Sequence, residues 1–94
     1  MEEKRILHLV LKKRWFLALD RGKKKEEYRE IKDYWEKRLD NKKYDIVIFY
    51  LGYRKDRPRM CFHIKSIKKG YGKEEWGAEF GKYYYIIRLG KRIY

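Results

Sequence analysis

Residues Gly22 to Arg29 read Gly-Lys-Lys-Lys-Glu-Glu-Tyr-Arg, and this charged segment is the most informative part of the chain. It lies between residues 12–20 and 31–39, two stretches whose apolar residues recur with helical spacing. A run of charges alone is usually a solvated surface, but the flanking helices should hold this one within the folded body. Polar side chains that are fixed by such elements are candidates for a functional site.

Two helices are predicted on either side of this segment. Glycine adopts the left-handed conformation without strain, so the first helix should end before Gly22. The apolar face of the first helix, over residues 12–20, consists of Trp15, Phe16 and Leu19. The apolar face of the second helix, over residues 31–39, consists of Ile31, Tyr34, Trp35 and Leu39.

Five strands are predicted from apolar runs and from alternation with a period of two. They cover residues 5–11, 24–29, 44–51, 59–68 and 82–89. In the short second strand, the alternation places Lys24 on the face opposite to Glu27 and Arg29. Two early helices and strands gathered in the second half predict an α+β fold with a curled or closed sheet. The length of 94 residues, without a repeat or linker, predicts a single domain over residues 1–94.

The net charge of +13 indicates a polyanionic partner. It arises from 27 lysines and arginines against 14 acidic residues. The excess is spread over the chain, because residues 1–39 carry 13 basic and 8 acidic side chains and residues 40–94 carry 14 and 6. A folded domain with this field attracts polyanions, and nucleic acid, either RNA or DNA, is the leading candidate. Two other interpretations stay open: lysines that only confer solubility, and a basic surface that engages an acidic protein partner.

Several other classes of site or location are not indicated. The single cysteine, Cys61, lies between Met60 and Phe62, so we expect a buried structural thiol. His8 and His63 lie in apolar strands and are expected to be core histidines, and we expect no metal site and no cofactor. No apolar run reaches membrane-spanning length and no signal peptide is recognised, which predicts a cytoplasmic protein without membrane contact. We also expect a monomer.

The charged segment contains a recognisable motif. Gly22, Lys24, Glu27 and Arg29 reproduce the pattern G-x-K-x-x-E-x-R, after a strand and a helix that carries Trp15 and Phe16. The motif and the order of elements resemble the ASCH domain of the PUA-like superfamily over nearly the whole chain. This resemblance implies a small β-barrel of five or six strands with two helices. It also implies a cleft beside the motif that takes RNA, nucleotides or modified nucleobases.

A binding site is predicted around this motif and two aromatic segments. Tyr53 lies in a basic loop, where a base can stack on the ring while cations hold the backbone. Trp76 lies among glycines and is either a stacking platform at the cleft mouth or a plug for the barrel end. The predicted ligand-binding residues are Lys24, Glu27, Arg29, Tyr53, Arg54 and Trp76. The alternative for the motif itself is an ion-pair cluster that positions the strand.

Enzymatic function is a further alternative. The family that the chain resembles includes a ribonuclease and an amidohydrolase that acts on 4-acetylcytidine. In the amidohydrolase, the motif lysine and a threonine three positions later serve catalysis together with a distant glutamate. Lys24 matches the lysine, but Glu27 occupies the position of the threonine, so the hydroxyl group is missing. If the chain is an enzyme, the predicted catalytic residues are Lys24 as base and Glu27 or Glu75 as carboxylate. Glu74 and Glu79 are other candidates for the distant carboxylate.

Overall fold

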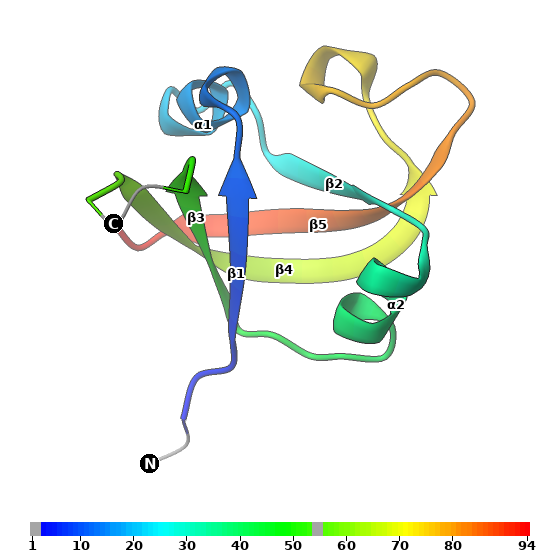
Figure 1. Ribbon diagram of the computed structural model, residues 1–94, viewed down its shortest axis with the longest axis horizontal. Coiled ribbons are helices and arrows are strands. Elements are labelled where there is room, and N and C mark those ends of the chain that lie inside the picture. The colour runs from blue at the N-terminus through cyan, green and yellow to red at the C-terminus, as the bar shows by residue number, and fades with distance from the viewer. Residues whose placement is uncertain (1–2, 54–55) are drawn as a thin grey trace.

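The computed structural model describes residues 3–53 and 56–94. Five strands and two α-helices fold into a small α+β arrangement (Figure 1). The elements in chain order are β1 (Ile6–Leu11), α1 (Lys13–Asp20), β2 (Glu26–Glu30), α2 (Asp33–Leu39), β3 (Ile46–Leu51), β4 (Arg59–Tyr71), the 3₁₀ helix η1 (Glu74–Trp76) and β5 (Tyr83–Arg92).

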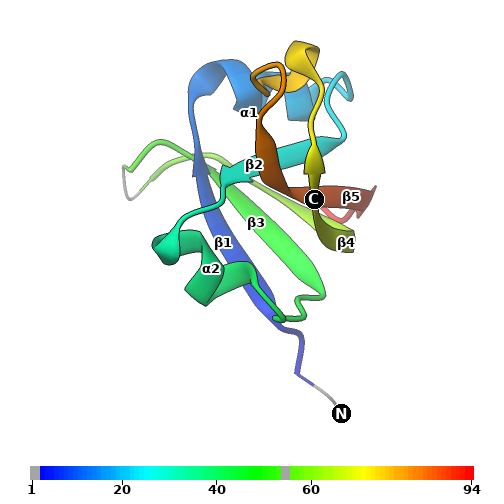
Figure 2. The same cartoon turned by 90° about the vertical axis from the view of Figure 1, so that its right-hand side faces the viewer.

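The strands form one mixed sheet in the order β1-β3-β4-β5-β2. β1 and β3 pair in parallel, and the other neighbours pair antiparallel. The sheet curls into a half-barrel (Figures 1 and 2), with the long strand β4 in the middle of the strand order. Register irregularities between Phe62 and Ser66 bend β4, as bulges do. These features confirm the predicted α+β class, the five strands, the two helices and the curled sheet.

The core fills the concave side of this sheet. β1 alternates between buried and exposed positions, with Leu7, Leu9 and Leu11 facing inward. β3 is covered on both faces, so all residues from Ile46 to Phe49 are buried. α1 contributes Phe16 and Leu19, and the short helix α2 contributes Leu39. Burying a leucine or phenylalanine side chain stabilises the fold by about 1.5–3 kcal/mol, which is why these few helical residues suffice to fix both helices.

The connection between the parallel strands β1 and β3 creates two free strand edges. It contains α1, β2 and α2, and β2 pairs only with β5, at the far side of the sheet. β1 pairs only with β3. The half-barrel is therefore open between β1 and β2, and the free edges of these strands form the sides of the opening.

Three local predictions were wrong. β2 begins at Glu26, so Lys24 belongs to the turn after α1 and the predicted strand alternation does not apply to it. His8 and His63 are exposed, because each lies on the outward-facing positions of its strand. Tyr34 is 51% exposed, because α2 has only seven residues and buries only Leu39 fully. The prediction for Cys61 is confirmed, since it is 1% exposed.

Candidate functional site

The opening between β1 and β2 contains a cleft of about 600 Å³. The carboxyl-terminal end of β1 and residues 27–30 of β2 lie along it, and side chains from α1, α2 and the η1 region enclose it. We call it the β1–β2 cleft. At its base, Arg29 Nη2 donates a hydrogen bond of 3.1 Å to the carbonyl oxygen of Val10, which links the two free edges. The motif segment therefore lies at the one place where the sheet fails to close.

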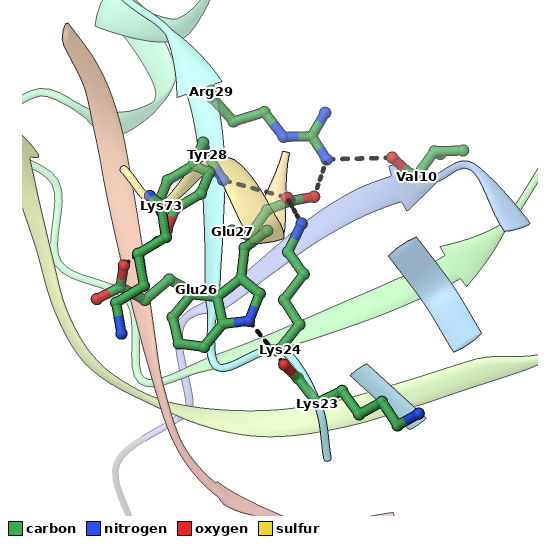
Figure 3. Close-up of polar contacts among 9 residues, drawn as sticks. Val10, Lys23, Lys24, Glu26, Glu27, Tyr28, Arg29 and Lys73 are labelled. Carbon is green, nitrogen blue, oxygen red and sulfur yellow. Dashed lines mark hydrogen bonds and ion pairs between the residues drawn. The ribbon is translucent and has the colours of Figure 1, made fainter. Parts of the chain in front are cut away.

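Lys24, Glu27 and Arg29 form a single ion-pair cluster in this cleft (Figure 3). Lys24 Nζ donates to Glu27 Oε1 at 2.9 Å, and Arg29 Nη2 donates to Glu27 Oε2 at 2.9 Å. The backbone N–H of Tyr28 also donates to Glu27 Oε1, at 3.1 Å. Glu27 is thus held by three donors, so its carboxylate is fixed in position and occupied.

Lys24 is an unusually buried lysine. Only 1% of its side chain is exposed, and Nζ lies 4.3 Å from the centroid of the Trp15 ring. Burial lowers the pKa of Lys24 because desolvation penalises the ammonium form, and the positive charge of Arg29 lowers it further. The carboxylate of Glu27 opposes both effects through its charge and its hydrogen bond. Glu27 is therefore the group that favours the charged form of this buried lysine.

Arg29 retains hydrogen-bonding capacity that the cluster does not use. Its guanidinium lies 5.0 Å from the centroid of the Trp35 ring, and both hydrogen bonds that it donates within the described residues leave from Nη2. Nε is buried and has no partner among the described residues, while 19% of the side chain remains exposed. A buried donor without an acceptor costs about 1–3 kcal/mol, so an acceptor supplied from the cleft would be stabilising.

All three tryptophans of the chain line the β1–β2 cleft. Trp15 comes from α1, Trp35 from α2 and Trp76 from η1. Trp76 is half-buried, and its indole N–H donates to the carbonyl oxygen of Lys23 at 2.6 Å, which anchors η1 beside the motif. A Cβ at Gly77 would lie 2.8 Å from Trp15, so only glycine allows η1 to approach α1 this closely. Three large aromatic surfaces are thereby brought together from separate elements.

The charges along the cleft are mixed. Among the described residues, five basic side chains line it: Lys12, Lys24, Arg29, Lys32 and Lys82. Three carboxylates line it as well: Glu27, Glu30 and Glu79. Lys82 and Glu30 lie 3.8 Å apart at the exposed rim. The part of the cleft that the structure describes therefore combines aromatic faces with both hydrogen-bond donors and acceptors.

The predicted site residues are only partly brought together. Lys24, Glu27, Arg29, Tyr53 and Trp76 all line the cleft, with Tyr53 86% exposed at its edge. Arg54 lies outside the described residues. Glu75 is exposed on η1 and is not among the described residues that line the cleft. Glu79 is the carboxylate from this region that does line it, which makes Glu79 a better candidate for the distant carboxylate than Glu75.

Sequence reasoning missed several residues that line the cleft, chiefly Trp15, Trp35, Tyr28 and Tyr84. The two tryptophans were assigned to apolar helix faces, and both are only partly buried because those faces continue into the opening. Tyr28 supports the site from behind: its hydroxyl donates to Glu26 at 2.8 Å and accepts from the Lys73 N–H at 2.9 Å. Burial raises the pKa of Tyr28 well above that of free tyrosine.

Comparison of the chain with protein-family models, with curated proteins and with solved structures gives no match. Within residues 3–53 and 56–94, no group of histidine, cysteine and carboxylate side chains is arranged to hold a metal ion. Over the same residues, no helix has the length and apolarity needed to cross a bilayer. The function must therefore be inferred from the chemistry of the cleft.

Proposed function

We propose that the chain is an ASCH-type domain of PUA-like fold that binds a nucleobase, in RNA or in a free nucleotide, in the β1–β2 cleft. The observation that supports this most directly is Arg29, which is fixed by Glu27 and Val10 and keeps donors that the described residues do not use. Base edges offer carbonyl and ring-nitrogen acceptors, and arginine is suited to such planar recognition.

The aromatic surroundings support a planar ligand. Trp15, Trp35 and Trp76 provide faces on which a base can stack, and the mixed charges of the cleft suit a base with both donors and acceptors better than a bare phosphate. The convergence of the motif residues in one cluster at this opening is consistent with the family resemblance. The phosphate of a nucleotide would then lie toward the lysines at the rim, such as Lys32 and Lys82.

Tryptophan fluorescence provides the test, because all three tryptophans line the cleft. Titration with the four nucleoside monophosphates should quench the fluorescence of the wild-type protein with saturation. Arg29→Lys keeps the charge but loses the planar donor set, so it should weaken binding about tenfold or more. Arg88→Lys is the matched control, since Arg88 pairs with Glu26 at the exposed surface. Unquenched fluorescence at millimolar nucleotide, or equal affinity in both variants, would exclude the proposal.

A hydrolase of the same fold is the second candidate, and the burial of Lys24 is the observation that favours it. A lysine whose pKa is lowered by burial can act as a general base near neutral pH. However, the ammonium donates to Glu27, and Glu27 replaces the hydroxyl group that the amidohydrolase branch uses. Turnover of 4-acetylcytidine or labelled RNA that is lost in Lys24→Met would support this function. Absence of turnover at enzyme concentrations near that of substrate would exclude it.

A further inference from the structure

A second cavity of about 580 Å³ lies between the end of α2 and the far part of β4. None of the residues that line it also line the β1–β2 cleft. Its floor is the ring of Tyr85, which is 2% exposed and whose hydroxyl has no hydrogen-bond partner among the described residues. The cavity is thus a separate polar depression on the concave side of the sheet.

The rim of this cavity is strongly basic. Four lysines line it: Lys42, Lys43, Lys68 and Lys69. The one carboxylate among the described residues that line it is Asp40, which lies 3.7 Å from Lys69 in an exposed pair. Exposed pairs of this kind contribute little and exchange readily with solvent ions. The rim therefore keeps an excess positive charge that can attract phosphate groups.

An exposed aromatic pair continues directly from this cavity. Lys69 is opposite Tyr85 in the sheet, and Tyr71 is opposite Tyr83. Side chains two residues apart on a strand share a face, so these two pairs of side chains lie on the same side of the sheet. The distance along a strand from one pair to the next is about 6.6–6.8 Å. Tyr71 and Tyr83 are 70% and 47% exposed and meet edge to face, with centroids 5.0 Å apart. Tyr71 and Tyr83 thus form a pair of adjacent exposed rings beside the lysines of the cavity, a combination suited to base stacking.

We propose that this surface binds a single-stranded nucleic acid. We call it the Lys–Tyr strip, consisting of Lys42, Lys43, Lys68, Lys69, Tyr71 and Tyr83. The lysines hold phosphates at the cavity, and unpaired bases stack on the exposed tyrosines one step along the strands. A duplex keeps its bases stacked on one another and cannot use the tyrosines, so the strip selects single strands. None of the residues of the strip lines the β1–β2 cleft. Binding of an oligonucleotide to the strip can therefore be tested separately from binding of a mononucleotide in the cleft.

The test is fluorescence anisotropy with a labelled ten-nucleotide oligouridylate at several salt concentrations. The double variant Tyr71→Ala/Tyr83→Ala should weaken binding about tenfold or more, as expected for loss of base stacking. Lys42→Gln/Lys43→Gln should weaken binding and reduce the slope of log affinity against log salt by about 1.4. Neither pair should change the affinity for nucleoside monophosphates. The four substituted positions are all exposed, and the least exposed of them is Tyr83, at 47%. Both variants should therefore fold.

Matched controls separate the strip from general charge and exposure. Phe80→Ala removes an aromatic ring that is 92% exposed outside the strip, and it should change affinity less than twofold. Lys13→Gln/Lys65→Gln removes the same charge from exposed positions that line neither cavity, and it should retain the wild-type affinity within twofold. Equal effects of the strip variants and these controls would overturn the proposal. So would equal binding of a ten-base-pair duplex, or unchanged affinity in the tyrosine variant.

Discussion

Arg29 on β2 donates a hydrogen bond from Nη2 to the carbonyl oxygen of Val10 on β1, at 3.1 Å. This side chain substitutes for the backbone hydrogen bonds that the two free edges do not make with each other. The same nitrogen also donates to Glu27, so closure of the half-barrel and construction of the ion-pair cluster depend on one group. Any substitution of Arg29 therefore affects both the stability of the fold and the geometry of the proposed binding site, and variants must be designed to separate the two effects.

Glu27→Gln should lower the free energy of unfolding by about 3–5 kcal/mol, because it leaves the buried ammonium of Lys24 without its carboxylate. Lys24→Met should cost less, since Glu27 would still be paired with Arg29. The double variant should recover part of the loss of Glu27→Gln, because the unpaired buried charge is gone. Urea denaturation of all four proteins measures this. Additive losses would show that the two side chains do not interact.

Stability should rise with pH through the contribution of Lys24. Its pKa is lowered in the folded protein, so between that lowered value and the unfolded value of 10.5 the unfolded chain binds more protons. Each unit of increasing pH in this window therefore favours the folded state. The difference in unfolding free energy between wild type and Lys24→Met should increase with pH across this window, toward pH 10.5. A flat difference over this range would show that Lys24 keeps an ordinary pKa.

The pH experiment requires one control. Burial raises the pKa of Tyr28 and of Tyr85, so ionisation of these phenols in the unfolded chain destabilises the fold above about pH 10, in the opposite direction. Subtraction of the Lys24→Met profile removes both contributions. In a Tyr28→Phe background, the difference in unfolding free energy between the protein with Lys24 and its Lys24→Met variant should still increase with pH.

Gly77→Ala should destabilise the protein and displace Trp15. The added Cβ would lie 2.8 Å from the Trp15 ring, and the glycine has a φ of 104°, which is strained for other residues. We expect a loss of about 2–3 kcal/mol from the combined strain and overlap, with a shift in tryptophan emission. Gly81→Ala is the matched control, because Gly81 also has a positive φ but faces open space. It should cost about 1 kcal/mol and leave the emission unchanged.

Tyr28→Phe should loosen the η1 region without unfolding the sheet. The hydroxyl of Tyr28 accepts the Lys73 N–H and donates to Glu26, so its removal leaves that amide without a partner. Hydrogen exchange of the Lys73 amide should accelerate about five- to twelvefold, as expected from loss of one net hydrogen bond of about 1–1.5 kcal/mol. The amide of Ile87 in the core of β5 serves as the reference and should keep its protection. Equal acceleration at both amides would indicate global destabilisation instead.

The general architecture could be predicted from the sequence because its signals are local. Helical spacing located α1 and α2, and the apolar run at residues 44–51 located β3. The lengths of β4 and β5 were underestimated, since both continue through residues whose pattern is polar and whose pairing partners are distant in sequence. The motif identified three residues of the cleft. The role of Trp15 and Trp35 could not be predicted, because periodicity cannot distinguish an apolar face that meets the core from one that borders an opening.

The pairing of β2 also determines when the cleft can exist during synthesis. Residues 26–30 are matched only with residues 84–88, almost sixty positions later. Closing so long a loop costs conformational entropy before any contact repays it. On the ribosome, the motif segment is therefore made well before β5 and remains without its neighbouring strand until β5 emerges. A nascent chain that has not yet exposed β5, or a chain truncated before β5, should therefore lack the β1–β2 cleft.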